Sequence, residues 1–338
     1  MYDDGFLKRL EDGVRAALPL WDVSPDTELK LLTISENATF RATGTGRATD
    51  LVFRVHRPEY HTLAEIESEL AWIGALRAEG VVATPEPVAL RKGGLVAHID
   101  DAGSTRHVVA FEHVTGEEPR EGEDLARWFT ELGAIHARLH AHSKRWKRPD
   151  GFVRKVWNHA STVGNTPLWG DWRAGLGLTA EGRAILERTV RVLGDRLAAL
   201  GDGPESFGLV HADLRLANLL VDGDRLTLID FDDCGFSWYL YDFAAAVSFL
   251  EHEPYIPALR DAWVEGYRTV ALLSEAEAGL LPTLVMLRRI LLTAWVASHA
   301  ETPTALSMGT AYTDGTVALA EAYLSAQEMP AQSPPAKA

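Results

Sequence analysis

Hydrophobic residues in the first 113 positions alternate between strand-like and helical spacing. Residues 5–18 have the pattern of a short amphipathic helix. Much of the following region consists of short runs of β-branched and apolar residues bounded by turn residues, which is typical of strands. We predict strands over residues 28–34, 38–43, 48–56, 87–90, 94–99 and 107–113.

One long helix is expected to interrupt these strands. After Pro58, apolar residues recur on one helical face as far as Glu79, and Gly80 follows as the expected C-cap. The run Gly44-Thr45-Gly46-Arg47 has the composition of a hairpin turn between two strands. The first 113 residues therefore predict a small antiparallel sheet with one long helix.

Helical spacing dominates the rest of the chain. Residues 144–177 hold four tryptophans and many turn residues, and residues 207–229 return to short extended pieces. The tail, residues 329–338, is rich in Pro, Ala and Ser, and we expect it to be disordered. Helices are predicted over residues 125–142, 181–200, 256–273, 275–299 and 312–327.

This pattern predicts an α+β protein with two lobes. Residues 1–113 form a β-rich N-lobe and residues 114–328 a larger, mostly helical C-lobe, with a connector near residues 112–118. The length of 338 residues exceeds that of a usual single core, which agrees with this division.

The segment LVHADLRLANLLVDGDRLTLIDFDD, residues 209–233, contains the strongest chemical signal. His211, Asp213 and Asn218 form the pattern His-x-Asp-x-x-x-x-Asn, and Asp230 follows twelve residues later. Two apolar runs around an Asp-Gly turn lie between Asn218 and Asp230. A hairpin there would bring both side chains to the same end.

Such a cluster suits phosphoryl transfer, in which the protein mainly positions the nucleophile and neutralises charge. Mg²⁺ prefers oxygen ligands, commonly one or two carboxylates together with phosphate oxygens. We assign Asp213 as the catalytic base, and Asn218 and Asp230 as Mg²⁺ ligands. His211 is expected to brace the loop.

These residues resemble the aminoglycoside phosphotransferase and choline kinase superfamily, whose fold is related to that of protein kinases. Asp230-Phe231-Asp232 is closer to its small-molecule branch than to protein kinases, and type II homoserine kinases, hydroxylysine kinases and bacterial stress-response kinases look nearest. The resemblance covers about residues 28–325. It implies a protein-kinase-like fold, ATP and Mg²⁺ as cofactors, and a small hydroxylated acceptor such as an amine or amino acid.

Three further acidic residues have two interpretations each. Asp232 could contact a second metal ion or cap a turn, and Asp233 could face solvent or substrate. Asp242 resembles a family residue that braces the catalytic loop, and it could also be the N-cap of the helix starting at Phe243.

The nucleotide side departs from the family pattern at one position. In the resembled family a strand lysine contacts the ATP phosphates and pairs with a helix glutamate. Arg54 occupies that position here, with Glu69 as the expected partner and Glu65 as its competitor. The departure leaves open a catalytically weak nucleotide-binding protein, because arginine and lysine are not interchangeable at a tight site.

The resemblance also places two nucleotide contacts in loops. Ser35 and Asn37 match a Ser-x-Asn phosphate loop of the small-molecule branch. In the connector, backbone groups near Glu112 and Val114 are expected to contact adenine.

The acceptor pocket is expected near Asp213, in the helical lobe. Candidate residues there are Asp233, Trp238, Tyr239 and Arg288. The Trp238-Tyr239 pair could stack on a cationic group, although core packing is the alternative. Arg288 could bind a substrate carboxylate.

The charge balance and the cysteine count of the chain limit the kinds of partner that we expect. The 48 acidic and 33 basic residues give a net charge of −15, which argues against a nucleic-acid partner. Cys234 is the only cysteine, so no disulfide can form within the chain. The sequence lacks a signal peptide and a long uncharged apolar run, so we expect a cytoplasmic monomer or homodimer without a membrane partner.

Two other functional classes remain as alternatives. One is a protein Ser/Thr kinase of the same fold, which the eleven residues between Asp230 and Asp242 disfavour because they leave little room for an activation loop. The other is the weak nucleotide-binding protein that Arg54 suggests.

Overall fold

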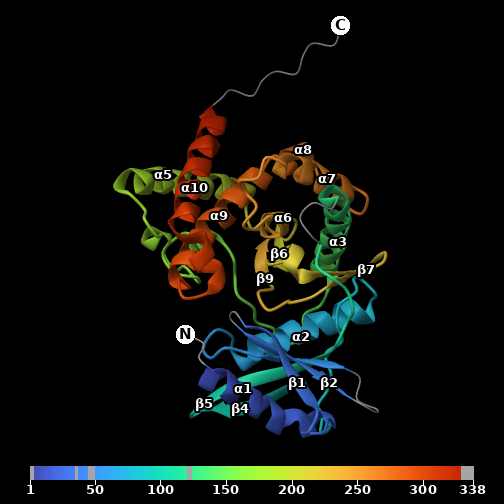
Figure 1. Ribbon diagram of the computed structural model, residues 1–338. Coiled ribbons are helices and arrows are strands. Elements are labelled where there is room, and N and C mark those ends of the chain that lie inside the picture. Colours follow the sequence, from blue (N-terminus) through green and yellow to red (C-terminus); the bar gives the residue numbers. More distant parts are fainter. Residues whose placement is uncertain (1–3, 35–36, 45–49, 120–123, 329–338) are drawn as a thin grey trace.

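The computed structural model describes residues 4–34, 37–44, 50–119 and 124–328. Figure 1 shows a sheet-containing lobe below and a mostly helical lobe above, with helix α2 (Leu63–Ala78) between the sheet and the upper lobe. The α+β, protein-kinase-like class predicted from the sequence is confirmed. The predicted tail lies outside the described residues.

The N-lobe is built on one antiparallel sheet with the strand order β1-β2-β3-β5-β4. Alternating burial along β2 places Ala38, Phe40 and Ala42 in the core. Helix α1 (Asp4–Ala17) and the short η1 (Leu18–Trp21) pack on this core. The strands are β1 (Glu28–Ile34), β2 (Ala38–Thr43), β3 (Leu51–Val55), β4 (Val96–Asp101) and β5 (Ser104–Glu112).

Helix α2 begins with a capping box. The Thr62 hydroxyl accepts from the Glu65 N–H at 3.2 Å, and the Glu65 carboxylate accepts from the Thr62 N–H at 2.8 Å. Trp72, Ile73 and Leu76 at the other end of this helix belong to the C-lobe core, because they pack with residues such as Phe231. Helix α2 therefore packs against both lobes.

The C-lobe consists of helices around two small strand pairs. Helices α3 and α7 pack closely, and α9 contacts both α6 and α10. The helices are α3 (Leu125–Arg145), α4 (His159–Thr162), η2 (Trp172–Ala174), α5 (Ala180–Leu200), η3 (Leu216–Asn218), α6 (Tyr241–Ala246), α7 (Ile256–Arg268), α8 (Glu275–Ala278), α9 (Leu281–Ser298) and α10 (Pro303–Glu328).

Two antiparallel strand pairs frame the predicted catalytic segment. Strand β6 (Phe207–Val210) pairs with β9 (Gly235–Trp238), and β7 (Leu219–Asp222) pairs with β8 (Arg225–Leu228). The predicted hairpin is therefore present. Its register continues past the strands, because the Ile229 N–H donates to the Asn218 carbonyl at 3.0 Å.

Several predicted elements differ from the structure. Residues 87–90 form no strand and contribute only an isolated bridge between Pro87 and Phe111. The Val88 N–H donates to the Ala110 carbonyl at 2.8 Å, but the Leu90 N–H donates to the Gly94 carbonyl at 2.9 Å, so the pairing does not continue. The helix predicted over 275–299 is divided into α8 and α9, with Pro282 in the first turn of α9. The last helix starts at Pro303 rather than at residue 312, and it has a kink at Gly309.

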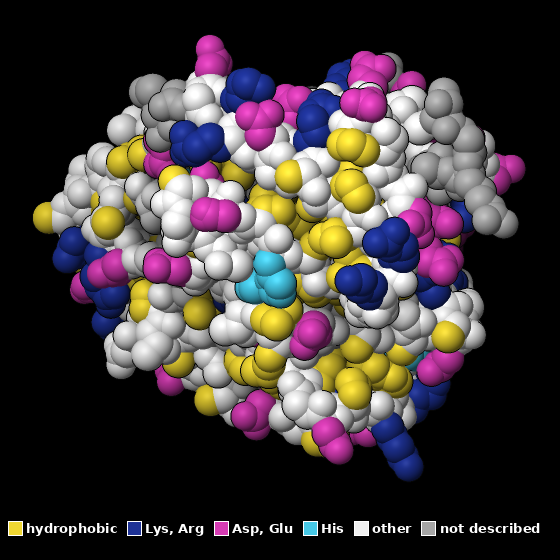
Figure 2. Space-filling model, turned by 90° about the horizontal axis from the view of Figure 1, so that it is seen from below, with side chains coloured by type: hydrophobic (Ala, Val, Ile, Leu, Met, Phe, Trp, Pro, Cys, Tyr) yellow, Lys and Arg dark blue, Asp and Glu magenta, His cyan; other side chains and the backbone are white. Residues whose placement is uncertain are grey.

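Among the described residues, one segment, Glu275–Ser298, is apolar and long enough to cross a membrane. Its mean hydropathy is 1.6, and 72% of that apolar window is buried within the protein, as a core helix would be. On the face formed mainly by the N-lobe, described acidic and basic side chains are interspersed with small apolar areas (Figure 2). The expectations of no membrane and no nucleic-acid partner stay predictions.

Candidate active site

A buried carboxylate, that of Asp242, binds the backbone of the catalytic loop. Asp242 on α6 accepts hydrogen bonds from the backbone N–H groups of Ala212, at 2.8 Å, and His211, at 3.3 Å. Helix α6 begins at Tyr241, so Asp242 lies within its first turn and is not the N-cap. Of the two interpretations of Asp242, the contacts agree with the loop brace.

Buried histidines complete this support. His140 lies 2.9 Å from Asp242, and His136 stacks on His140 and accepts from the Trp263 indole N–H at 2.8 Å. Burial keeps the His136 ring neutral by lowering its pKa to about 3. The pair therefore contributes to the packing between α3 and α7.

His211 is fully buried, and its ring lies against Phe231 with the centroids 4.4 Å apart. Phe231 in turn contacts Trp72 of α2 edge-on at 5.6 Å. Burial lowers the pKa of His211, so its imidazole is neutral at physiological pH. These contacts agree with a brace that ties the catalytic loop to the rest of the core.

Asp213 and Asn218 lie side by side in the loop. The Asn218 amide nitrogen donates to the Asp213 backbone carbonyl at 2.7 Å and to the Asp213 Oδ2 at 3.0 Å. Because the Asn218 amide nitrogen faces Asp213, the side-chain oxygen of Asn218 points elsewhere and is the atom that could bind a metal ion or accept a hydrogen bond. The other carboxylate oxygen of Asp213, Oδ1, receives a 2.7 Å hydrogen bond from Arg288.

Asp230 has a strained backbone, with φ at 61°, in a region that non-glycine residues rarely adopt. Ala212 in the catalytic loop shares this conformation, with φ at 66°. Such strain clusters at functional sites because the surrounding structure must hold it. The Asp230 side chain is 48% exposed and lies 3.3 Å from the Arg54 guanidinium.

The electrostatic surroundings of Asp230 favour a cation. The half of the carboxyl group that the protein shields from water raises its pKa, Arg54 opposes this shift, and the carboxylates of Asp232 and Asp213 reinforce it. Among the described residues, no group of three or more His, Cys, Asp or Glu side chains could hold a metal ion. Asp230 and the Asn218 side-chain oxygen, together with oxygens of the nucleotide, stay the predicted ligands of a metal here.

Arg54 on β3 pairs with Glu69 on α2. One guanidinium nitrogen lies 2.6 and 2.7 Å from the two oxygens of Glu69, and both residues are buried. The expected competitor, Glu65, is occupied by the capping box of α2. Arg54 thus joins the sheet and α2 to Asp230, and its role in phosphate binding stays a prediction.

Asp232 is buried and directed toward N-lobe side chains. Its carboxylate accepts from the Asn37 amide at 2.8 Å and lies 3.4 Å from His56 and 3.5 Å from His61. Burial opposes its ionisation, yet Arg54 and these histidines hold the pKa of Asp232 well below its usual range. These contacts give Asp232 a further role, because it joins the two lobes, and its contact with a second metal ion stays a prediction.

The remaining nucleotide-side predictions fall in loops. Ser35 lies outside the described residues. The Asn37 amide oxygen accepts from the Arg57 N–H at 3.1 Å, so its polar groups are engaged with protein. The Glu112 N–H donates to the Glu86 carbonyl at 2.9 Å, and Val114 is half-buried in the connector. The contact of this backbone with adenine stays a prediction.

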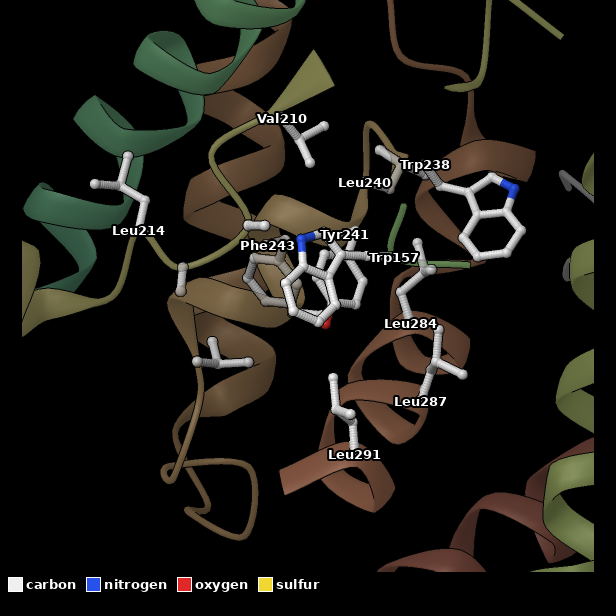
Figure 3. Close-up of a cluster of buried hydrophobic side chains, with 14 of the residues drawn as sticks. Trp157, Val210, Leu214, Trp238, Leu240, Tyr241, Phe243, Leu284, Leu287 and Leu291 are labelled. Carbon is white, nitrogen blue, oxygen red and sulfur yellow. The ribbon is translucent and has the colours of Figure 1, made fainter. Parts of the chain in front are cut away.

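Trp238 and Tyr239 are core residues, which corrects their prediction as acceptor contacts. The Trp238 indole donates to the Gly201 carbonyl at 2.9 Å, and the Tyr239 hydroxyl donates to the Pro204 carbonyl at 3.3 Å. Figure 3 shows Trp238 pointing away from the loop that carries Val210 and Leu214. The apolar surfaces of both rings are used in packing around the end of α5.

Arg288 is also occupied by protein groups. It is 1% exposed, and besides Asp213 it donates to the Tyr241 hydroxyl at 3.1 Å and to the Ser248 hydroxyl at 3.1 Å. Its predicted role as a ligand of a substrate carboxylate does not fit these contacts, because a guanidinium with three protein partners offers little to a substrate.

Asp233 lies beside Tyr60, which no sequence motif marked, and this tyrosine contacts Trp169. The Tyr60 hydroxyl is 2.5 Å from its carboxylate and accepts from the Trp169 indole at 2.8 Å. Trp169 also lies over the Arg288 guanidinium, 4.9 Å away, so this group reaches the neighbourhood of Asp213. Tyr60 is distant in sequence from the motif, and no local pattern marked it, whereas Trp169 belongs to the tryptophan-rich segment over residues 144–177, for which a pocket wall and simple packing are both open interpretations.

Two basic residues were also missed. Arg215 is half-exposed, and its guanidinium lies 3.5 Å from the Asp213 carboxylate. Its position two residues after the catalytic base was a usable signal. Arg154 donates to the backbone carbonyls of Asp232, Cys234 and Glu65, which fixes the segment after Asp230 against α2.

The fold and this cluster define the class of a two-lobe, kinase-like phosphotransferase. The model of the phosphotransferase enzyme family matches residues 29–278, which is most of the chain. The chain therefore belongs to the phosphotransferase enzyme family, and the aminoglycoside phosphotransferase and choline kinase resemblance is confirmed.

Known relatives agree with this membership. An aminopropanol kinase associated with a microcompartment is 45% identical, with a TM-score of 0.86 over 94% of this chain and 98% of that one. An amicoumacin kinase structure with AMP-PNP and Ca²⁺ has a TM-score of 0.75 at 21% identity, covers 94% of both chains, and shows the fold alone.

Among curated sequences, homoserine kinase of Rhizobium johnstonii is 30% identical over 62% of this chain and 61% of its own length. The chain thus spans little more than half the length of the first curated relatives it matches.

Proposed function

We propose that this protein transfers the γ-phosphate of ATP to the hydroxyl group of a small amino alcohol. The observation that carries the proposal is the cluster of Asp213, Asn218 and Asp230, joined to the Arg54–Glu69 pair. Family membership supports the reaction type. The 45% identity with an aminopropanol kinase, over nearly the full length of both chains, supports the acceptor class.

Each polar residue of the cluster has a distinct role in this proposal. Asp213 orients the acceptor hydroxyl and takes its proton as the oxygen attacks the γ-phosphorus. Oδ2 of Asp213 accepts hydrogen bonds from Asn218 and Arg215, whereas Oδ1 accepts only one, from Arg288, so Oδ1 keeps a further lone pair for the hydroxyl. Arg54 contacts the nucleotide phosphates and Arg215 the transferred phosphoryl group.

Asp230 and Asn218 would hold Mg²⁺ with the nucleotide phosphates. The ion would neutralise charge on the phosphoryl group during transfer. The donor set fits a hard cation, because it consists of a carboxylate and an amide oxygen. Asp230 also lies among like charges that a cation would relieve.

The acceptor amine is expected on the side of Asp233, Tyr60 and Trp169. The Asp233 carboxylate suits an ammonium group through charge pairing, whereas the rings of Tyr60 and Trp169 already lie against protein cations and would mainly shape the pocket wall. This group lies next to Arg288, which contacts the catalytic base. The hydroxyl group of the acceptor would thus contact Asp213, and its amine would contact Asp233.

An amino acid acceptor is the second candidate, and the 30% identity with a homoserine kinase supports it. A protein substrate is disfavoured, because the segment between Asp230 and Asp242 is taken up by β9, which pairs with β6 and leaves little of an activation loop.

The test measures ADP release from MgATP with 1-amino-2-propanol, ethanolamine, choline, homoserine, hydroxylysine and an aminoglycoside. We expect amino alcohols to give the highest kcat/KM, and Asp213→Asn to reduce turnover by at least about 100-fold. Turnover with homoserine alone would show that the acceptor is an amino acid and not an amino alcohol. No turnover, together with no thermal shift on adding MgATP, would refute the kinase proposal.

A further inference from the structure

We propose that Arg288 is a positioning residue that holds the carboxylate of the catalytic base Asp213 in its working orientation. The proposal rests on the proposed function, because it assumes that Asp213 is the base. It gives Arg288 a task that differs from the acceptor contact predicted from the sequence.

The geometry around Asp213 carries the inference. A carboxylate on a short side chain can rotate about its terminal bond, so fixing its plane requires a partner on each oxygen. Arg288 binds Oδ1 at 2.7 Å, and Asn218 binds Oδ2 at 3.0 Å. The two contacts come from opposite parts of the chain, one from α9 and one from the catalytic loop.

Arg288 is itself immobilised. Its Nε donates to Ser248 and its Nη1 to Tyr241, and the guanidinium lies 4.9 Å from the Trp169 ring and 5.7 Å from the Tyr241 ring. The side chain is 1% exposed. A rigid, buried guanidinium can fix another group, whereas a surface arginine would move with solvent.

Burial of this charge needs a reason. Moving a cation out of water is costly unless a carboxylate and further acceptors compensate it. Asp213 supplies that carboxylate, with its side chain 17% exposed and therefore open to the substrate side. The arrangement keeps the base accessible while its partner stays inside the core.

The neighbouring Arg289 provides a matched control. It is equally buried, at 3% exposure, and it pairs with Glu251 at 2.8 Å and contacts Tyr312 and Thr316. It points toward α10 and away from the catalytic loop. Removing the Arg289 guanidinium leaves the buried Glu251 carboxylate without its ion-pair partner, and removing that of Arg288 frees one oxygen of Asp213, so only the change at Arg288 alters the base.

The experiment compares Arg288→Gln with Arg289→Gln in the full chain, at a temperature where both are folded. We expect both to melt earlier than the wild type. Arg288→Gln should lower kcat by about 100-fold, the loss that a misplaced catalytic group produces. Its KM values for ATP and acceptor should change by less than about threefold, because no substrate contact is removed. Arg289→Gln should keep kcat within about threefold.

The milder pair Tyr241→Phe and Ser248→Ala tests the same proposal if Arg288→Gln does not fold. Combined, they loosen Arg288 without touching Asp213, and we expect kcat to fall by about tenfold with unchanged KM. The proposed function is tested separately, by the ADP release of the wild type with each acceptor. If the wild type phosphorylates none of the acceptors, the variants are compared by their rates of slow ATP hydrolysis.

Two results would overturn the proposal. The first is equal kcat for folded Arg288→Gln and Arg289→Gln, or no loss in the combined mild variant. The second is a rise in acceptor KM at unchanged kcat, which would make Arg288 an acceptor contact after all.

Discussion

Arg54 occupies the position where the family pattern has lysine, and its planar guanidinium explains how the site accommodates it. One nitrogen bridges both oxygens of Glu69, and another reaches Asp230. A lysine ammonium has a single nitrogen and cannot span both carboxylates in this way. The departure therefore agrees with a working site built around arginine.

Replacing Arg54 by lysine tests this interpretation. One charge-assisted hydrogen bond contributes about 1.5–3 kcal/mol, so Arg54→Lys should lower kcat/KM for MgATP by about tenfold to 100-fold. Glu69→Gln should act in the same direction, while Glu65→Gln, in the helix cap, should affect mainly stability. An Arg54→Lys variant as active as the wild type would indicate that arginine weakens ATP binding here.

Buried histidines make stability depend on pH. The pKa of His136 is about 3 in the folded protein, and those of His56 and His211 are also lowered by burial. In the unfolded chain a histidine titrates near about 6.5. Between these values the unfolded state binds more protons, so acid stabilises it relative to the folded state.

We therefore expect the free energy of unfolding to be fully retained above about pH 6.5 and to fall as the pH drops toward 3. The slope should be roughly 1 kcal/mol per pH unit for each such histidine. Urea unfolding at pH 7.5, 6 and 5 measures it, and His136→Gln should reduce the slope. A flat profile over this range would contradict the neutral state of the buried rings.

At the scale of elements, the packing of α3 against α7 depends on two glycines. A Cβ atom at Gly133 would overlap the Trp263 carbonyl, and one at Gly266 would overlap the Thr130 carbonyl. The two backbones therefore approach each other too closely for any side chain at these positions. Helix α3 also carries His140, so this crossing positions the partner of Asp242 beneath the catalytic loop.

Alanine at either glycine should separate the helices. We expect Gly133→Ala and Gly266→Ala each to cost about 3 kcal/mol in the free energy of unfolding, because backbone atoms have no room to move. Gly74→Ala is the matched control. No atom lies within 4 Å of a Cβ there, and alanine in this exposed helical position should stabilise by about 0.5–1 kcal/mol. Equal effects at all three positions, measured by urea unfolding, would contradict the close crossing.

Predictions of elements succeeded where the local pattern was strong. The boundaries of β1 and β2 match the predicted strands, because alternation and turn residues act over neighbouring positions. Failures occurred at prolines and at chain-distant pairing. Pro87 lies next to the sheet without joining it as a strand, and no local pattern distinguishes an isolated bridge from a short strand.

At the scale of the whole molecule, Asp232 joins the lobes. It lies in the segment after Asp230, and four N-lobe residues surround its carboxylate: Asn37, Arg54, His56 and His61. Arg154 adds a backbone link from the C-lobe to α2. These contacts place the sheet that carries Arg54 at a fixed position relative to Asp230.

Removing this carboxylate should weaken the whole protein. We expect Asp232→Ala to cost about 3–5 kcal/mol in unfolding free energy, because it removes one counter-charge of the buried Arg54 guanidinium and the partners of Asn37 and His61. The surface variant Asp224→Ala, which loses only an exposed pair with Arg127, should cost less than about 1 kcal/mol. Loss of Mg²⁺ affinity in Asp232→Ala without loss of stability would support its prediction as a metal ligand.

The sequence by itself determined the class of fold, the catalytic loop and the hairpin that brings Asn218 beside Asp230. These features depend on spacing within about 20 residues, where turn chemistry and strand pairing are local. The contact between Arg54 and Glu69 was also accessible, because the family pattern links a strand to the next helix.

Only the tertiary structure decided the surroundings of that loop. Arg288 reaches Asp213 across 75 residues, and Trp169 reaches Tyr60 across 109. The same packing withdrew Trp238 and Tyr239 into the core. Side chains of these types occur in cores and in binding sites alike. Which of the two they join depends on which surfaces come into contact when distant helices pack.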